Sequence, residues 1–404
     1  MEQKTMSDTD RTKWQTLLRK FENDNGLVIE EAKNEAGSNK GDNYTSIMIR
    51  TTVFGKSGDG KPYKKKFMTK ILPYTRPVTQ MINTEALYLI EGYIYEKLLP
   101  VIGDFGPRFV LLDKGEIIME DLAEQGYTNC DRRNHLDLEH TLFTLQNLAK
   151  WHGKSLSIKL KDPKYFEELT SPLKEIIFCT DTKSPIGGTV ENSMNCAIHH
   201  LESIKDQSED LKNAIGYLKT LKNQCYNSLT KLFNLPKDKY FTICHGDPWI
   251  NNILYKYDKN GKISDLKFVD YQIVRHSSVA TDFLYFVYTS VRSCYIENDY
   301  EKLVEHYHRH FSKCLEENGV NEEHLKNLNI DWFKSELKRF CLYGLLTGFW
   351  LIHVILADKD DVLDIDKLTM EDIENIENFY NIIDDKKLAR YQCVAEHFYK
   401  NFVK

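Results

Sequence analysis

The first third of the chain carries two kinds of hydrophobic pattern. Apolar side chains spaced three and four residues apart predict amphipathic helices at residues 11–22 and 79–99. Between them, residues 44–53 alternate apolar and polar side chains, which predicts a half-buried strand, and residues 65–72 are predicted to return beside it. A small sheet accompanied by helices is therefore expected in this part.

After residue 121 long helical patterns dominate, and a strand-rich stretch at residues 240–272 interrupts them. No Pro- or Gly-rich linker and no internal repeat divides the sequence. These patterns predict an α+β fold of two lobes that share a cleft. A small sheet-plus-helix lobe would comprise residues 1–121, and a larger, mainly helical lobe residues 122–404.

One stretch near the C-terminal end is apolar enough to suggest a membrane span. Residues 340–357 contain no Asp, Glu, Lys or Arg, and their length approaches that of a helix that crosses a bilayer. The stretch also holds Gly344, Gly348 and His353, and charges of both signs flank it. A buried helix of the larger lobe is the preferred interpretation, so no membrane span is expected, and a span is the alternative.

Composition narrows the classes of protein further. The 404 residues are 41% hydrophobic and 12% aromatic, which excludes a mostly disordered or collagen-like chain. The net charge is −6, and a mildly acidic chain lacks the electrostatic footprint of a nucleic-acid binder. Nine cysteines are scattered without metal-ligand spacing, and the polar N-terminus shows no secretory signal. We therefore expect free thiols and a cytoplasmic protein.

The segment at residues 240–255 carries the strongest chemical signal. An apolar strand ends there at a His-Gly-Asp sequence whose aspartate is Asp247, and Asn252 follows five residues later. A second apolar run leads directly to Asp270. Phosphoryl transfer needs a carboxylate that accepts the hydroxyl proton, and a second carboxylate and an amide oxygen that hold metal ions against the phosphates. This combination favours a catalytic site over the simpler interpretation in which Asp247 is a turn residue and Asn252 a loop cap. His245 is expected to brace the loop through hydrogen bonds.

A cation for the phosphates is expected in the first lobe. Lys70 lies inside the returning strand among apolar neighbours, where a lysine needs a counter-charge. Glu91 falls on the apolar stripe of the second helix, where a buried acid is costly unless it is paired. We predict a Lys70–Glu91 ion pair that contacts the phosphate side of a nucleotide, with Glu85 and Glu96 as the competing partners.

With these residues in place, the chain resembles the ecdysteroid kinase-like family, within the superfamily of aminoglycoside phosphotransferases and choline kinases. The resemblance covers the chain from about residue 30 to the end. The His-Gly-Asp element with its later asparagine is shared by the superfamily, whereas the Gly-x-Asn-Tyr-x-Ser and Asp-Tyr-Gln elements point more narrowly to the family. The motifs that carry it are Gly41-Asp42-Asn43-Tyr44-Thr45-Ser46 with Arg50, Phe67-Met68-Thr69-Lys70, Met119-Glu120-Asp121-Leu122, Trp151-His152, the loop at Asp247 with Asn252, and Val269-Asp270-Tyr271-Gln272 followed by Asp282.

The resemblance implies a bilobal protein-kinase-like fold, ATP as cosubstrate, Mg²⁺ as cofactor and a hydroxyl of a small molecule as acceptor. Ecdysteroids are the family's named example of that acceptor. Asp247 would be the catalytic base, and Asn252 and Asp270 would be the metal ligands. Asp282 would support the site. The residues implied to bind the nucleotide are Met119, Glu120 and Leu122 at the adenine, and Gly41, Asn43, Lys70 and Glu91 at the phosphates.

Two alternatives stay open. An amino alcohol such as choline or ethanolamine would keep the enzyme class, but it would need converging acids and aromatic rings for its cation. A catalytically silent pseudokinase that binds an apolar small molecule would be a different class. The intact set of Asp247, Asn252, Asp270 and Lys70 speaks against that second alternative.

Overall fold

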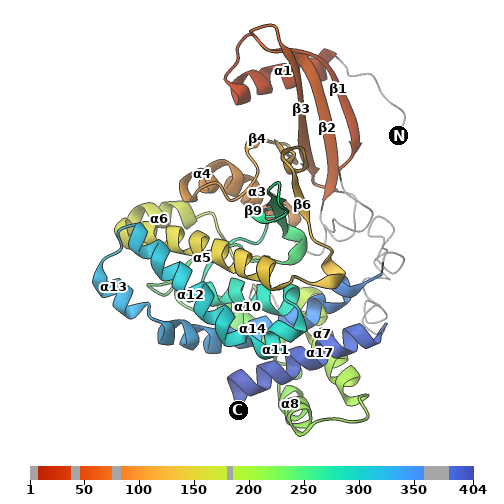
Figure 1. Cartoon of the computed structure of the whole chain (residues 1–404), viewed down its shortest axis with the longest axis vertical. Helices are drawn as coiled ribbons and strands as arrows, with labels where there is room; N and C mark the ends of the chain where they lie inside the picture. The colour runs from red at the N-terminus through yellow and green to blue at the C-terminus, as the bar shows by residue number, and fades with distance from the viewer. Residues whose placement is uncertain (1–7, 38–45, 75–82, 180–184, 359–381) are drawn as a thin grey trace. The chain divides into compact units, whose positions relative to one another are not determined.

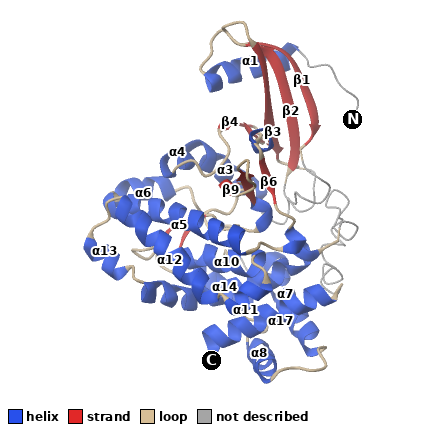
Figure 2. Cartoon of the chain, in the orientation of Figure 1, coloured by secondary structure: helices blue, strands red, loops and turns tan. Residues whose placement is uncertain are grey.

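The computed structural model describes residues 8–37, 46–74, 83–179, 185–358 and 382–404. Contacts between residues divide the chain into two compact units, of which the first extends to Thr128 and the second begins at Asn129. The first unit holds an antiparallel sheet, and the second is mainly helical (Figures 1 and 2). The predicted α+β organisation, with a small sheet-plus-helix part before a larger helical part, is confirmed.

The sheet of the first unit has five antiparallel strands in the order β1-β2-β3-β5-β4. Its strands are β1 (Val28–Ala36), β2 (Ile47–Lys56), β3 (Pro62–Ile71), β4 (Phe109–Asp113) and β5 (Glu116–Glu120). Strands β2 and β3 are the predicted pair, and Met48 stands opposite Lys70 in their register. Since side chains alternate between the two faces of a strand, Phe67 and Lys70 point to opposite faces of β3.

Each face of this sheet is covered by a helix. The helix α1 (Asp8–Glu22) packs Leu18 and Phe21 against Phe67 in the hydrophobic core of the unit. The helix α3 (Thr84–Tyr93) lies on the Lys70 face, and a π-helical turn η1 (Ile94–Leu98) and α4 (Leu99–Ile102) continue it. A Cβ on Gly92 would lie 2.6 Å from the side chain of Leu112, so any other residue at this position would force Leu112 to move.

Helices form most of the second unit, and short strands lie among them. The helices are α5 (Leu138–Lys161), α6 (Pro163–Thr170), α7 (Pro185–Glu202), α8 (Glu209–Thr220), α9 (Cys225–Phe233), α10 (Val279–Ser290), α11 (Ser293–Asn298), α12 (Tyr300–Glu317), α13 (Glu322–Asn327), α14 (Ile330–Leu356) and α17 (Asp385–Phe398). The strands are β7 (Thr242–Cys244), β8 (Ile253–Tyr257), β9 (Ile263–Phe268) and β10 (Arg275–Ser277). Strand β7 pairs with β10, and β8 forms a hairpin with β9. A further strand, β6 (Tyr127–Asn129), spans the boundary of the two units.

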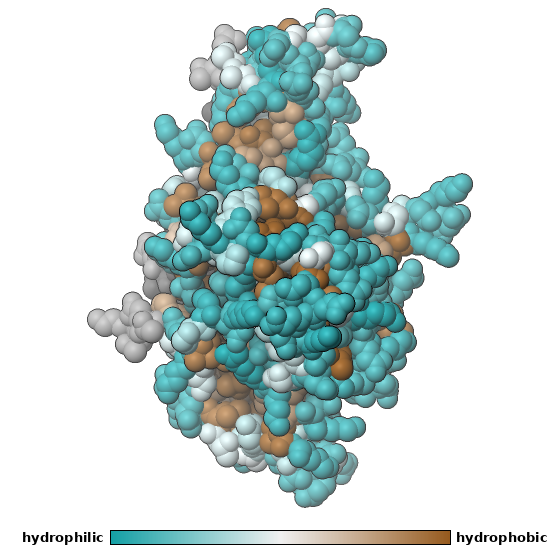
Figure 3. Space-filling model, turned by 90° about the vertical axis from the view of Figure 1, so that its left-hand side faces the viewer, coloured by the Kyte–Doolittle hydropathy of each residue, from teal (hydrophilic) through white to brown (hydrophobic). Residues whose placement is uncertain are grey.

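The apolar stretch that could be mistaken for a membrane span belongs to α14. This helix is long and apolar enough to cross a bilayer, but 67% of its most apolar window is buried inside the protein. It packs along α10, where Gly344 and Gly348 let Tyr288 approach closely. Hydrophilic residues cover most of the face shown in Figure 3, with smaller apolar patches between them. The burial of α14 and its packing along α10 are those of a core helix.

Candidate active site

The His-Gly-Asp sequence forms the loop that follows β7. Gly246 has a φ of 86°, and a Cβ there would lie 2.0 Å from the carbonyl oxygen of Ile273. Only glycine fits this position, because it tolerates positive φ and leaves room for the neighbouring backbone. A short 3₁₀ turn η4 (Ile250–Asn252) then leads into β8.

Asp282, in the first turn of α10, fixes the backbone of this loop. Its carboxylate accepts hydrogen bonds from the backbone N–H of His245 at 2.6 Å and of Gly246 at 2.8 Å. A third donor, Nε2 of His152, lies 3.0 Å away on α5. Burial alone would raise the pKa of Asp282, but the hydrogen bond from His152 and the other donors hold it below its ordinary value. The carboxylate is therefore ionised and fully buried, as a structural anchor.

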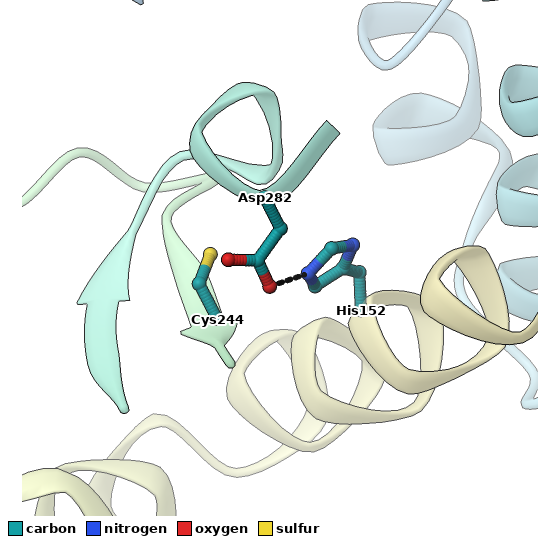
Figure 4. Close-up of side chains that lie close together, drawn as sticks. All are labelled: His152, Cys244 and Asp282. Atoms are coloured by element: carbon teal, nitrogen blue, oxygen red, sulfur yellow. Dashed lines mark hydrogen bonds and ion pairs between the residues drawn. The ribbon is translucent and has the colours of Figure 1, made fainter. Parts of the chain in front are cut away.

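Cys244 completes a buried cluster with His152 and Asp282 (Figure 4). Their ligand atoms lie within 4.8 Å of one another, a spacing that could hold a metal ion. Each group, however, already has a hydrogen-bonding role. The thiol lies 3.2 Å from the carbonyl oxygen of Ser278, and burial raises the pKa of Cys244 well above its ordinary value, so that the thiolate a metal needs is disfavoured. The hydroxyl of Tyr307 lies 2.6 Å from Nδ1 of His152. The cluster is best explained as a hydrogen-bond network.

His245 connects the two acidic segments of the site. Its Nδ1 accepts a hydrogen bond from the backbone N–H of Asp247 at 3.2 Å, and its Nε2 lies 3.2 Å from the carbonyl oxygen of Val269, the residue before Asp270. Burial lowers the pKa of His245, so the ring stays neutral and can donate from one nitrogen while accepting at the other. These bonds brace the loop and do not make the ring a base.

Asp247, Asn252 and Asp270 lie close together in the site. The amide Nδ2 of Asn252 donates to Asp247 twice, to its carbonyl oxygen at 3.0 Å and to its Oδ2 at 2.9 Å. The backbone N–H of Val269 donates to the carbonyl oxygen of Asn252 at 3.0 Å, which fixes the approach to Asp270. Asp270 itself has a φ of 65°, an uncommon conformation for a residue other than glycine. Strained backbone of this kind is often found at functional sites.

The electrostatic surroundings of Asp247 differ from those of Asp282. Burial and, next in size, the negative charge of Asp270 raise the pKa of Asp247 from 3.8 to about 7. Two neighbouring carboxylates and an amide oxygen are ligands that Mg²⁺ prefers. Asn252 fits such a role because its amide nitrogen is committed to Asp247, which leaves the amide oxygen for a metal. The residues present therefore fit a divalent cation.

The first unit contains the predicted ion pair. Nζ of Lys70 lies 2.7 Å from Oε2 of Glu91, with side chains that are 5% and 1% exposed. The hydroxyl of Tyr88, also on α3, donates to the carbonyl oxygen of Lys70 and holds β3 against the helix. Of the competing partners, Glu85 is exposed and Glu96 pairs with Lys97 on the surface.

The three residues predicted at the adenine have different surroundings. Met119 stands opposite Met68 and so lies on the Lys70 face of the sheet. Glu120 lies on the other face, where its carboxylate pairs with Lys65 at 2.8 Å, so only its backbone could serve a nucleotide. Leu122 is buried at the start of a 3₁₀ turn (Leu122–Gln125) that Asp121 caps. Gly41 and Asn43, predicted at the phosphates, lie outside the described residues.

A model of the ecdysteroid kinase-like family matches residues 40–320. The chain belongs to this family. Membership makes the protein a small-molecule kinase, a phosphotransferase with an alcohol-type acceptor. No curated protein matches the chain.

The chain is also similar, at low sequence identity, to solved structures. A Plasmodium vivax ethanolamine kinase is 15% identical, covers 83% of this chain and 79% of its own, and has a TM-score of 0.40. For the ADP-bound aminoglycoside phosphotransferase APH(2'')-Ib, the identity is 11%, the match covers 93% of this chain and 100% of that chain, and the TM-score is 0.33.

Tyr285 was missed by the sequence reasoning. Its hydroxyl donates to Oδ1 of Asp247 from the second turn of α10. A signal was present, because Tyr285 stands three residues after Asp282 and so shares its helix face. Its partner could not be predicted, because it lies 38 residues away in the sequence.

Proposed function

We propose that this family member is an ATP- and Mg²⁺-dependent kinase whose acceptor is an ecdysteroid or a similar apolar hydroxylated compound. The observation that carries the proposal is the grouping of Asp247, Asn252 and Asp270 on one braced loop system. A carboxylate with a pKa near 7, beside two possible metal ligands, suits proton acceptance from a hydroxyl.

Each residue has a role in this proposal. Asp247 accepts the proton as the acceptor oxygen forms its bond to the γ-phosphorus and the bond from phosphorus to ADP breaks. Asn252 and Asp270 would hold Mg²⁺, which when bound supplies positive charge against the phosphates. Lys70, oriented by Glu91, would contact the phosphates.

The nucleotide contacts of the first unit are also part of the proposal. Met119 and the backbone of Glu120 and Leu122 would bind the adenine, and Gly41 and Asn43 would contact the phosphates. The position of Met119 on the same sheet face as Lys70 supports this arrangement. The ion pairs of Glu120 support a backbone contact at that residue.

One aromatic cage in the second unit is already filled by a cation of the protein itself. The guanidinium of Arg275 lies 4.6 Å from the ring centre of Phe233, 5.6 Å from Phe178 and 5.8 Å from Tyr343. Tyr343 also donates to the carbonyl oxygen of Gly246, so the cage adjoins the catalytic loop. A protein cation already occupies these rings, which therefore offer no site for the ammonium group of choline.

The acceptor can be tested with the full chain and Mg²⁺–ATP. Parallel reactions would contain the ecdysteroid 20-hydroxyecdysone, choline, ethanolamine or a metabolite extract, with mass spectrometry to detect a phosphate adduct. We expect phosphorylation of the steroid and none of the amino alcohols, and the Asp247→Asn variant serves as the inactive control. Phosphorylation of choline alone would favour the amino-alcohol alternative. No adduct in any reaction would favour the silent binding protein.

A further inference from the structure

The carboxylate of Asp247 is held from two sides. The hydroxyl of Tyr285 donates to its Oδ1, and the amide of Asn252 donates to its Oδ2 at 2.9 Å. A carboxylate offers about four lone-pair positions, so these two bonds leave positions for an acceptor hydroxyl. They also remove its freedom to rotate, which otherwise lets a carboxylate turn away from its substrate.

Helix α10 holds three consecutive residues of the catalytic loop. Asp282 accepts the backbone N–H groups of His245 and Gly246, and one helical turn later Tyr285 donates to the side chain of Asp247. Residues three apart on a helix share a face, so the two side chains act on the loop from the same direction. The helix thus fixes the backbone of the loop and the rotation of its carboxylate together.

Tyr285 is built to remain a donor. Its side chain is buried, and burial raises the pKa of its hydroxyl well above the ordinary value, so it keeps its proton. Its ring packs 6.0 Å from the ring of Tyr343, which limits its own rotation. A buried hydroxyl with a fixed ring is a rigid support for the group that it contacts.

We infer that Tyr285 is a positioning residue for phosphoryl transfer, whose hydroxyl fixes the rotation of the Asp247 carboxylate toward the acceptor. This inference rests on the proposed function. Tyr285 takes no proton in the reaction: the proton of the acceptor hydroxyl goes to Asp247, and the phenol stays protonated throughout. Misplacement of a catalytic group by about 1 Å can lower a rate about 100-fold, which sets the scale of the effect.

The test replaces the hydroxyl alone. For Tyr285→Phe we expect kcat to fall about 10- to 100-fold, while KM for ATP and the thermal shift by Mg²⁺–ATP change less than about twofold. The matched control is Tyr288→Phe on the same helix, which removes a buried hydroxyl that lies 2.8 Å from Nδ1 of His397. The control should keep kcat within about twofold, so a general weakening of α10 would affect both variants alike.

A double-mutant cycle with Asp247→Asn separates positioning from a structural role. If Tyr285 acts only through Asp247, Tyr285→Phe should cause no further loss of kcat in the Asp247→Asn background. An equal loss in both backgrounds, or an unchanged kcat in Tyr285→Phe, would overturn this inference and leave the proposed function intact. If the unaltered chain transfers phosphate to none of the three compounds above and to nothing in the metabolite extract, the proposed function and this inference fail together.

Discussion

Asp282 and Asp247 contact the same loop of the second unit, yet their electrostatic surroundings are opposite. Asp282 is enclosed by three donors, and its pKa lies below the ordinary value. Asp247 also has donors, but burial and the nearby charge of Asp270 outweigh them, and its pKa rises to about 7. One carboxylate is stabilised as an anion by the folded protein, and the other is destabilised.

The difference separates a structural from a chemical use of the same side chain. An acid whose charge is fully balanced contributes to stability and has little tendency to take up a proton. An acid whose charge is poorly balanced lowers stability but can accept a proton near neutral pH, which a base requires.

Loss of the Asp282 carboxylate should destabilise the second unit strongly. We expect Asp282→Ala to lower the free energy of unfolding by about 3–5 kcal/mol, because it leaves two backbone N–H groups and His152 without their buried acceptor. Urea denaturation measures the loss. Asp282→Asn is the control, since it keeps an acceptor oxygen and should lose less. A loss below about 1 kcal/mol for Asp282→Ala would show that Asp282 does not anchor the loop.

The matching change at Asp247 should affect the rate and spare the fold. We expect Asp247→Asn to lower turnover at least about 100-fold, because no other described group of the loop is placed to accept the proton, while Mg²⁺–ATP still binds. A near-normal rate would contradict the assignment of the base.

The stability of the same variant has a predicted pH dependence. In the unaltered protein, the folded state keeps a proton on Asp247 up to about pH 7, whereas the unfolded state loses it near pH 3.8. The unfolding free energy therefore falls as pH rises through this window in the absence of Mg²⁺. Asp247→Asn removes that slope, so its stability relative to the unaltered protein should increase from pH 4 to pH 7.

Asp270 should matter for metal binding more than for folding. We expect Asp270→Ala to abolish the Mg²⁺-dependent part of the thermal shift that ATP produces, because it removes the carboxylate assigned to the metal. Differential scanning fluorimetry with and without Mg²⁺ measures this. An unchanged Mg²⁺-dependent shift would argue against the metal role of Asp270.

The smallest effect concerns the position of the acid limb of activity. Because Asp247 must be ionised to accept a proton, kcat/KM should fall as the pH drops below about 7 at low Mg²⁺. A cation bound at Asp270 offsets the charge that raises this pKa, so the limb should move to lower pH as Mg²⁺ increases. Profiles at two Mg²⁺ concentrations measure the shift. A limb that stays in place would show that Asp270 does not set it.

Sequence reasoning succeeded where the periodicity was strong and the contacts were local. It predicted the strands β2 and β3 and the core character of α14, because these segments alternate or bury apolar side chains. The extent of β1 was not visible in the hydrophobic pattern, since most of β1 is polar and exposed. Pairing with β2, and not hydrophobicity, makes that segment a strand.

At the site, the sequence indicated which residues carry chemistry but not which atoms meet. The spacing of Asp247, Asn252 and Asp270 marked the candidates, and the Lys70–Glu91 pair was suggested by the cost of burying each charge alone. The contact of Tyr285 with Asp247 depends on how α10 crosses the loop. Glu120 was expected at the adenine, but the pleat directs its side chain to the opposite face from Lys70.

The helix α1 and the strand β1 precede the part of the chain that matches the family model, which begins at residue 40. Yet α1 covers Phe67, and Lys65 bridges Glu22 of this helix to Glu120 of β5. A fragment cut at the family boundary would expose an apolar sheet face and leave β2 as an unprotected edge, open to pairing with other chains. Production of a soluble first unit therefore depends on residues that the family match does not include.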